Sequence, residues 1–302
     1  MHFFLRFYGG TSILPNLIIS IAAGITIGLA YTQVTSIATT LGLHRGMTHG
    51  AYKLSPLLNW IFRLILWLSV GIKWWAWCRV HAYHHMHTEN EVDGHSPMHK
   101  GGLSGVFLHN PGLYQASADD PRVIVSLSSR FQPDRWDHWL FDREWLGRLL
   151  GISLCVLLLG FVPGVIAYVV HIFAYIYLNA AINSIGHGAE ATGVNNRLER
   201  ILNSICERTG ERPGYEPATA KLKQVGNSLN FQWLAWITMG EGLHYNHHYR
   251  PRCATMRRFR GDHDPGLYVL YTLRALHLVG TFTVPEIEEK PLQDISQTPL
   301  HV

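Results

Sequence analysis

The chain has 302 residues, of which 47% are hydrophobic and only 15% are charged, and its formal net charge is +4. Soluble proteins carry about 25% charged residues, so this composition favours a membrane protein. The positive charge is small and no basic motif with interleaved aromatic residues occurs, so we exclude nucleic acid as a partner.

The first two apolar segments differ in their charges. Residues 16–43 contain no charged residue and no histidine. They predict one tilted transmembrane helix, because about 20 residues span the hydrocarbon core. Residues 57–77 contain Arg63 and Lys73 and end in a tryptophan-rich run. These side chains predict a helix that lies in the membrane interface without crossing it.

The third apolar block, residues 149–186, is uncharged apart from His171. Glycine and proline at 160–164 interrupt it and predict the turn of a hairpin between membrane helices at 145–160 and 165–185. The expected fold class is therefore all-α integral membrane, with about three to four transmembrane helices, interfacial helices and a cytoplasmic helical cap.

We expect a single membrane domain over residues 1–285. The segment 286–302 is polar, and we expect it to extend into solvent. The four cysteines have no CxxC spacing, so we expect neither an iron–sulfur cluster nor a zinc ribbon. They fit a reduced protein whose active site faces the cytoplasm.

Histidine is the outlier of the composition, with 19 residues. A metal site is the first explanation for so many imidazoles. Nine of them form one HxxxxH motif, two HxxHH motifs and a single histidine in the sequence NSxxH. These candidate ligands are His44, His49, His81, His84, His85, His187, His244, His247 and His248.

Helix geometry explains what these spacings can do. In HxxHH the first and last histidines differ by about 40° around a helix and can share one metal, whereas the middle one diverges by about 100° from its neighbour. Two such motifs facing each other, at 81–85 and 244–248, make a cradle for two metals. On an ideal helix His44 and His49 would be about 140° apart, so we expect a helix end or a distortion there.

The ligand type narrows the choice of metal. Imidazole suits iron, zinc and copper, whereas calcium and magnesium prefer oxygen. Structural zinc sites hold four ligands and usually include cysteine. Here nine histidines are enough for two metals with an open position. Asn183 lies four residues before His187, on the same helical face, and is a candidate to orient a metal-bound water. Asp93 and Glu241 are candidates to hydrogen-bond the ligand imidazoles.

The three boxes in this order, with NSxxH between the second and third, resemble the membrane fatty acyl desaturases related to stearoyl-CoA and other delta-9 desaturases. The resemblance covers roughly residues 30–255. Further matching segments are Thr88-Glu89, Asp93-Gly94-His95-Ser96, Gly240-Glu241-Gly242 and Arg250-Pro251.

The resemblance implies two Fe²⁺ ions, O₂ as co-substrate and insertion of a cis double bond into a saturated acyl chain at delta-9. It assigns one iron to His44, His49, His81, His85 and His247. It assigns the other to His84, His187, His244 and His248, with Asn183 holding a water. The chain departs from the family in two places. The helical hairpin that usually precedes the first box is incomplete, and the third box has asparagine one position late, at Asn246.

The implied partners are the lipid bilayer, an acyl substrate carried by CoA, acyl carrier protein or lipid, and an electron donor. No haem-binding HPGG segment or cysteine cluster occurs, so the donor is a separate protein of ferredoxin, rubredoxin or cytochrome b5 type. A basic run could dock this donor or an acyl-carrier phosphate, or simply sit at the cytoplasmic membrane surface. It consists of Arg250, Arg252, Arg257, Arg258 and Arg260.

Four tryptophans are candidates to line a substrate tunnel, although tryptophan also anchors proteins at the membrane interface. They are Trp74, Trp75, Trp77 and Trp233.

Two other functions compete with acyl desaturation. A related di-iron oxidase, such as a hydroxylase, an acetylenase or a sterol- or carotenoid-type oxygenase, would use the same ligands. A histidine-rich metal transporter would place its ligands within the spans. Here the spans are nearly free of them, which disfavours transport. Histidines merely scattered over the surface and core would not produce these spacings.

Overall fold

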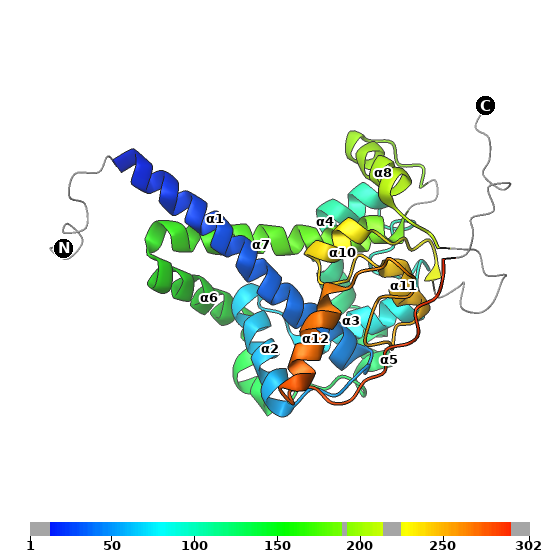
Figure 1. Ribbon diagram of the computed structural model, residues 1–302, viewed down its shortest axis with the longest axis horizontal. Coiled ribbons are helices and arrows are strands. Elements are labelled where there is room, and N and C mark those ends of the chain that lie inside the picture. Colours follow the sequence, from blue (N-terminus) through cyan, green and yellow to red (C-terminus); the bar gives the residue numbers. More distant parts are fainter. Residues whose placement is uncertain (1–12, 189–191, 214–224, 291–302) are drawn as a thin grey trace.

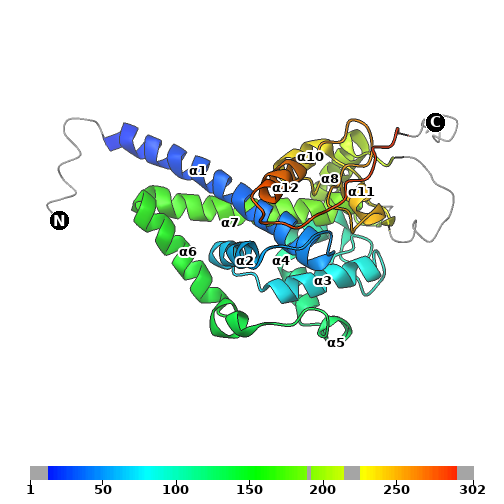
Figure 2. The same ribbon diagram turned by 60° about the horizontal axis from the view of Figure 1, so that its bottom comes forward.

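The computed structural model describes residues 13–188, 192–213 and 225–290. Within these ranges the chain is helical, with a few isolated β-bridges and no strand. Two long helices, α1 (Ile13–Ile37) and α7 (Phe161–Ser184), run side by side and project from a compact helical body (Figure 1). A third helix, α6 (Glu144–Leu159), accompanies them and turns into α7 at Gly160, as Figure 2 shows.

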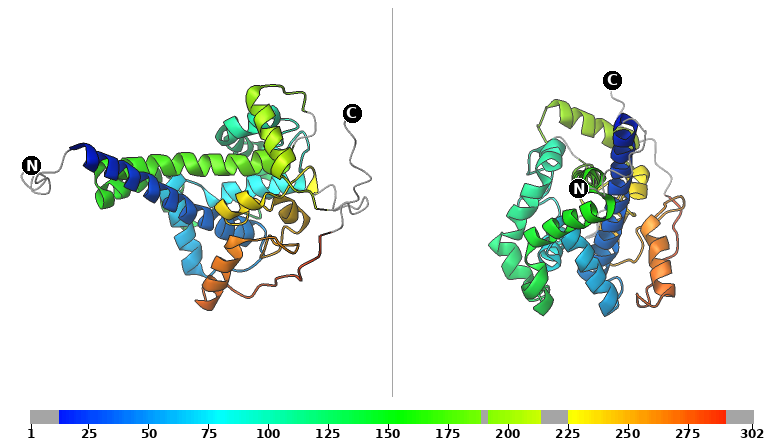
Figure 3. Two further views of the ribbon diagram at one scale, coloured as in Figure 1. Left: turned by 45° about the horizontal axis from the view of Figure 1, so that its top comes forward. Right: turned by 90° about the vertical axis from the view of Figure 1, so that its left-hand side faces the viewer.

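Small residues allow α1 and α7 to pack closely. A Cβ atom added at Gly24 would lie 2.9 Å from the carbonyl oxygen of Pro163, and one at Gly28 would lie 2.5 Å from that of Ala167. Only glycine permits this approach of the two backbones, as in the small-xxx-small pattern of membrane helix pairs. The two helices therefore cross in close contact at Gly24 and Gly28, and Figure 3 shows the crossing from two further directions.

Among the described residues, two helices are long and apolar enough to cross a membrane, Leu14–Thr48 and Phe161–His187. They contain the predicted spans at 16–43 and 165–185. The predicted hairpin turn is present, although α7 starts four residues earlier than expected. Helix α6 is apolar but has only 16 residues. A third span would exist if the bent pair formed by residues 56–70 and 74–86 crossed as one unit.

The prediction of one continuous helix over residues 57–77 is wrong. The chain forms α2 (Pro56–Val70) and α3 (Trp74–Met86), which are bent by 91° relative to each other. The break lies at Gly71, whose φ of 73° is a left-handed conformation that favours glycine and ends a helix. Helix α2 runs across the direction of α7 (Figure 1), and its position in the membrane interface stays a prediction.

The remaining helices form the body around the inner ends of α1 and α7. Helix α4 packs against α7 and α8, and the buried carboxylate of Glu199 accepts hydrogen bonds from the first backbone amides of α4. The body contains α4 (Gly102–Ala118), α5 (Pro121–Leu127), η3 (Asp137–Phe141), η4 (Ile185–His187), α8 (Arg197–Thr209), α10 (Gln232–Ile237), α11 (His244–Tyr249) and α12 (Pro265–Ala275).

The start of the polar tail does not extend into solvent as predicted. The backbone of Glu288 forms an isolated β-bridge with that of Phe259. Its side chain forms ion pairs with Arg250 and Arg258. Lys290 pairs with Glu211 at 2.5 Å. Residues 286–290 therefore lie against the body, because their carboxylates neutralise nearby arginines. Residues 291–302 of the predicted tail lie outside the described residues.

Candidate metal centre

The three histidine boxes and His187 meet at the inner ends of α1 and α7. The first box lies on the π-helix η2 (Ala38–Thr48) and its C-cap, the second on α3, and the third on α11. His187 ends the short helix η4, just beyond α7. All nine histidines are buried or half-buried.

The first box is distorted as predicted. Residues 38–48 form a π-helix, and the backbone amide of His49 donates to the carbonyl of His44 at 3.1 Å, an i→i+5 bond. This wider winding brings residues five apart onto one face, whereas an ideal α-helix would separate them by about 140°. The hydroxyl of Thr48 donates to the carbonyl of Leu43 and supports the same winding.

Five histidines form the first group, and their candidate ligand nitrogens all lie within 4.8 Å of one another. The Nε2 atoms follow one another at short distances: His49 to His81 3.1 Å, His81 to His85 3.1 Å, His85 to His247 2.9 Å and His247 to His44 2.9 Å. Three different helical segments thus point nitrogens at one centre.

Four histidines form the second group, with the same 4.8 Å limit between their candidate ligand nitrogens. Its Nε2 distances are His187 to His244 3.0 Å, His244 to His248 3.2 Å and His248 to His84 3.3 Å. The middle histidine of each HxxHH motif joins the other group, as the helix-face argument predicts.

Hydrogen bonding between the rings cannot account for these contacts. A ring Nε2 has a single in-plane position that holds either a proton or a lone pair, so it makes one hydrogen bond. Yet the Nε2 of His85 lies within 3.1 Å of two others, those of His81 and His247. A cation at the centre satisfies all these lone pairs at once.

The spacing also fits a metal ion. With metal–imidazole bonds of about 2.1 Å, adjacent ligand nitrogens at right angles lie about 3.0 Å apart. The Nε2 distances in the two groups, 2.9–3.3 Å, agree with this value. An all-imidazole donor set suits first-row transition metals.

The surroundings of the third box favour the neutral imidazoles that metal binding requires. Burial and the neighbouring histidines lower the pKa of His244 and His247 well below the ordinary histidine value. Burial likewise lowers the pKa of His95, beside the second group, to about 3. Neutral imidazoles keep a lone pair available at neutral pH, so the site is prepared for a cation.

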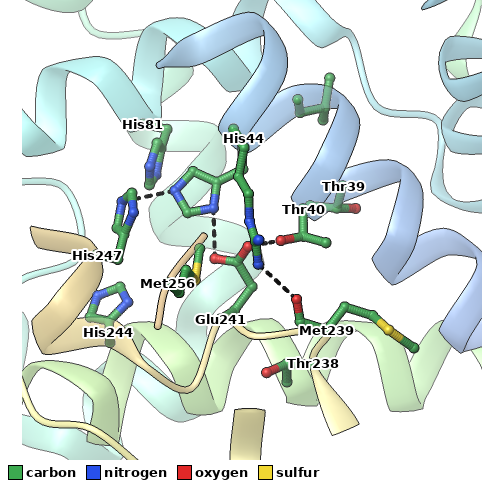
Figure 4. Close-up of polar contacts among 12 residues, drawn as sticks. Thr39, Thr40, His44, His81, Thr238, Met239, Glu241, His244, His247 and Met256 are labelled. Carbon is green, nitrogen blue, oxygen red and sulfur yellow. Dashed lines mark hydrogen bonds and ion pairs between the residues drawn. The ribbon is translucent and has the colours of Figure 1, made fainter. Parts of the chain in front are cut away.

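A carboxylate orients one ligand of the first group. The Nδ1 atom of His44 lies 2.6 Å from the Oε2 atom of Glu241, and the hydroxyl of Thr40 donates to the other carboxylate oxygen (Figure 4). Such a partner fixes the tautomer of the ring and raises its basicity as a ligand. The sequence analysis named Glu241 for this role but did not foresee Thr40.

A second carboxylate serves the second group. The Nδ1 atom of His84 lies 2.9 Å from the Oδ2 atom of Asp93. Although burial alone would raise the pKa of Asp93, the adjacent His84 holds it below its ordinary value. Glu89, which the sequence analysis noted only as part of a motif, lies 3.7 Å from the Nδ1 atom of His187.

The buried Arg45 fastens the first box both to Asp264, the N-cap of α12, and to the loop before the third box. The Arg45 guanidinium donates to both carboxylate oxygens of Asp264, at 2.7 and 3.0 Å, and to the carbonyl of Met239 at 2.9 Å. The loop that it holds carries Glu241 two residues later. No local spacing in the sequence could indicate the ion pair of Arg45 with Asp264, because its members are 219 residues apart.

The displaced asparagine of the third box has its own network. Asn246 donates to the carboxylate of Asp262 at 2.8 Å and to the carbonyl of Met256 at 3.0 Å, and it also pairs with Asn230. The departure from the usual box therefore changes the surrounding hydrogen bonds and leaves all three histidines in place.

Comparison with known proteins decides the family. Residues 19–258 match the family described as fatty acid desaturase. The chain belongs to this family. It is similar to an acyl-CoA C20 delta5-desaturase of Anemone leveillei, with 29% identity over 84% of this chain and 72% of the relative. It is also similar to delta-9 desaturase-like 2 protein of Arabidopsis thaliana, with 24% identity over 87% and 78%.

The names of the relatives include both acyl-CoA and acyl-lipid substrates, and both delta-5 and delta-9 positions of the double bond. Delta-9 acyl-lipid desaturase 2 of Arabidopsis thaliana is 24% identical over 73% of this chain and 61% of the relative. The membership itself makes the protein an oxygen-dependent fatty acid desaturase in a membrane, acting on an acyl substrate. The family depends on iron, and the two histidine groups could bind metal ions.

A cavity of about 430 Å³ reaches the histidines of the desaturase. It lies between α3, α4 and α7, and its walls include His81 and His95 at one end. Trp75 and Trp77 line it, and Trp77 stacks on the ring of His81 at 4.9 Å between ring centroids. The cavity therefore leads from the protein surface to the metal centre.

The other two tunnel candidates lie elsewhere. The indole of Trp74 donates to Asp137 at 2.9 Å, and Trp233 is 43% exposed and donates to Thr209. Neither is among the residues that line the cavity. Trp74 fixes the start of α3 to the segment before α6, and Trp233 lies on the surface of α10.

Asn183 lines the same cavity, near its histidine end. Its side-chain amide donates to Asn110 on α4 at 2.9 Å. The chain passes from α7 into the 3₁₀ helix η4 between Asn183 and His187, so the two residues do not continue one regular helix face. Its role in holding a water stays a prediction.

The basic run is only partly available to a partner. Arg258 is buried over the ring of Tyr249, and both Arg250 and Arg258 pair with Glu288. Arg257 is half-buried. Arg252 and Arg260 are exposed, and Arg260 lies 3.3 Å from Glu289.

Proposed function

We propose that the two histidine groups each hold one iron. We further propose that the enzyme inserts a cis double bond at delta-9 of a saturated acyl chain, using O₂ and two electrons from a separate protein. The observation that carries the proposal is the convergence of five and four Nε2 atoms on two centres. Asn183 is proposed to hold a water beside them.

Bound iron supplies the activation of O₂ that an unactivated CH₂–CH₂ bond requires, which no side chain can provide. The chain's own residues bind and place the substrate. The apolar wall of α3, with Trp75, Trp77 and Val80, holds the acyl chain and excludes water. Glu241 and Asp93 keep the ligand rings His44 and His84 oriented.

The length of the cavity supports delta-9. From Lys73, at one end of its lining, to His81, at the other, the chain advances eight residues along α3. At about 1.5 Å per residue this is about 12 Å. An extended chain covers about 1.2 Å per bond, so about ten bonds fit. With a carboxyl carbon beside Lys73, the ninth and tenth carbons lie eight and nine bonds away, about 10–11 Å along the cavity and close to His81, whereas delta-5 needs about half that length.

The electron donor is proposed to be an acidic protein of ferredoxin, rubredoxin or cytochrome b5 type. It would meet the exposed Arg252 and Arg260, which follow the third box. Exposed arginines on this side also favour a metal centre that faces the cytoplasm.

The experiment compares the fatty acids of cells that produce the wild type or His85→Ala, by mass spectrometry. We expect new delta-9 unsaturated chains in the wild type alone, because His85 contacts two ligand rings of the first group. Met86→Ala, on the exposed end of α3, is the matched control and should behave as the wild type. Hydroxylated or triple-bonded products would instead assign a sister oxidase activity.

A further inference from the structure

Three charged side chains line the cavity at the end away from the histidines. Lys73 Nζ lies 2.7 Å from Glu144 Oε1, and Arg148 Nη1 lies 3.6 Å from Glu144 Oε2. All three residues line the cavity. One carboxylate is thus shared by two cations at the mouth of a cavity whose α3 wall is aromatic and aliphatic.

The backbone is shaped to admit this arrangement. At Gly71, in the break between α2 and α3, an added Cβ would lie 2.7 Å from Arg148 Nη1 and 3.0 Å from the Glu144 carbonyl oxygen. The guanidinium also reaches the carbonyl of Val70 at 3.4 Å. The bend that the sequence did not predict therefore makes room for Arg148 at the mouth.

The ion pairs are weak enough to rearrange. The side chains of Lys73, Glu144 and Arg148 are 29%, 36% and 45% exposed, respectively. Ion pairs at such exposure contribute little to stability because solvent screens them, so an anion of the substrate can replace Glu144 at little cost.

The mouth opens beside lipid-facing side chains. Trp145 and Leu149, which follow Glu144 and Arg148 on α6, are 63% and 52% exposed. An aromatic ring next to a cation at the start of an apolar helix is typical of the lipid headgroup level. Lys73 and Arg148 therefore have the surroundings that are typical of cations at the level of lipid phosphates.

We propose that Lys73 and Arg148 bind the phosphate of a glycerophospholipid whose acyl chain enters the cavity. This rests on the proposed function and names its substrate as an acyl lipid. The distance between the acyl carbonyl and the phosphorus atom favours a glycerophospholipid over acyl-CoA or acyl carrier protein. The lysine side chain extends about 6 Å from its backbone, and about six bonds, or ~7 Å, separate an acyl carbonyl from the phosphorus of a glycerolipid. In acyl-CoA or acyl carrier protein about fourteen bonds, or ~17 Å, intervene, which is too far.

The test is equilibrium binding to the iron-loaded full-length protein in detergent micelles. The probes are radiolabelled dipalmitoyl phosphatidylglycerol, dipalmitoylglycerol, which lacks the phosphate, and palmitoyl-CoA. We expect Lys73→Gln and Arg148→Gln each to weaken binding of the phospholipid roughly tenfold, since each removes a charge-assisted hydrogen bond. Binding of dipalmitoylglycerol and palmitoyl-CoA should stay unchanged. Glu144→Gln should tighten phospholipid binding.

Lys53→Gln, at an exposed lysine that does not line the cavity, is the control and should match the wild type. Unchanged phospholipid binding in both cation variants would overturn the proposal. So would an equal loss for dipalmitoylglycerol, which indicates damage to the cavity, or a loss confined to palmitoyl-CoA, which indicates a soluble carrier. Failure of the proposed function can be distinguished from failure of this proposal. The first appears as the absence of unsaturated products in cells, and the second as unchanged phospholipid binding by the cation variants.

Discussion

Glu241→Gln removes one negative charge from the surroundings of the first histidine group while keeping its hydrogen bonds. The amide oxygen of glutamine can accept from His44 Nδ1, as the carboxylate does at 2.6 Å. The amide NH₂ can donate to the hydroxyl oxygen of Thr40, which now donates to the carboxylate. The fold should persist, so the variant reports the effect of the charge on metal binding.

The expected loss is selective and large. Mutating the hydrogen-bond partner of a metal-bound histidine typically costs 10- to 100-fold in affinity, or about 1.4–2.8 kcal/mol, and Glu241→Gln removes the charge of that partner. The side chains of His44 and Glu241 are only 3% and 11% exposed, so solvent screens their interaction little. We therefore expect a loss toward the upper end, near 100-fold, at the first metal alone. The second group keeps Asp93 and should bind its metal as before.

Asp93→Asn is the counterpart for the second group. The Asp93 carboxylate accepts from His84 Nδ1 and from the backbone amides of Glu89 and His95. An asparagine must turn its NH₂ toward one of these donors, so we expect lower stability, by about 1–3 kcal/mol, as well as a weaker second metal.

The assay titrates the metal-free protein with Fe²⁺ under anaerobic conditions and counts tight and weak equivalents per chain. The wild type should show two tight equivalents, and each variant one tight and one weak. Equal weakening of both equivalents in Glu241→Gln would refute the assignment of separate groups. An unchanged titration would refute the role of the carboxylate.

Three further changes test the packing and the cavity. Arg45→Met leaves the fully buried carboxylate of Asp264 without its counter-ion and should cost about 3–5 kcal/mol of stability in detergent unfolding; a loss below about 1 kcal/mol contradicts the account. Gly28→Leu forces α1 away from α7 and should cost about 1–3 kcal/mol, whereas Gly112→Leu, where nothing lies within 4 Å of an added Cβ, should be tolerated. Trp77→Ala enlarges the cavity beside the metal centre and should give a mixture of double-bond positions by mass spectrometry; a single position would exclude it as a determinant.

Local spacing predicted how the nine histidines divide into two groups, because helix geometry fixes which side chains share a face. The division of each HxxHH motif between two groups and the distortion between His44 and His49 both follow from residues at most five apart. The hairpin turn at Gly160 was foreseen for the same reason, since glycine and proline act on the backbone where they stand.

Features that depend on residues far apart in the chain were not foreseen. The sequence predicted a continuous helix through Gly71 because the apolar pattern carries on across this single glycine. The left-handed conformation of Gly71 leaves room for Arg148 and the Glu144 carbonyl of α6, which lie far away in the sequence. The partner of Arg45 lies 219 residues away, and the tail was expected in solvent because Glu288 showed no local partner. A charge pattern alone does not say which opposite charge the fold will supply.

Anomalous diffraction from crystals of the purified enzyme, recorded at the iron and zinc absorption edges, tests the central claim most directly. The account predicts two iron peaks, one enclosed by the Nε2 atoms of the five histidines of the first group and one by those of the four of the second. A single peak, or two peaks that appear at the zinc edge without an iron signal, would contradict it.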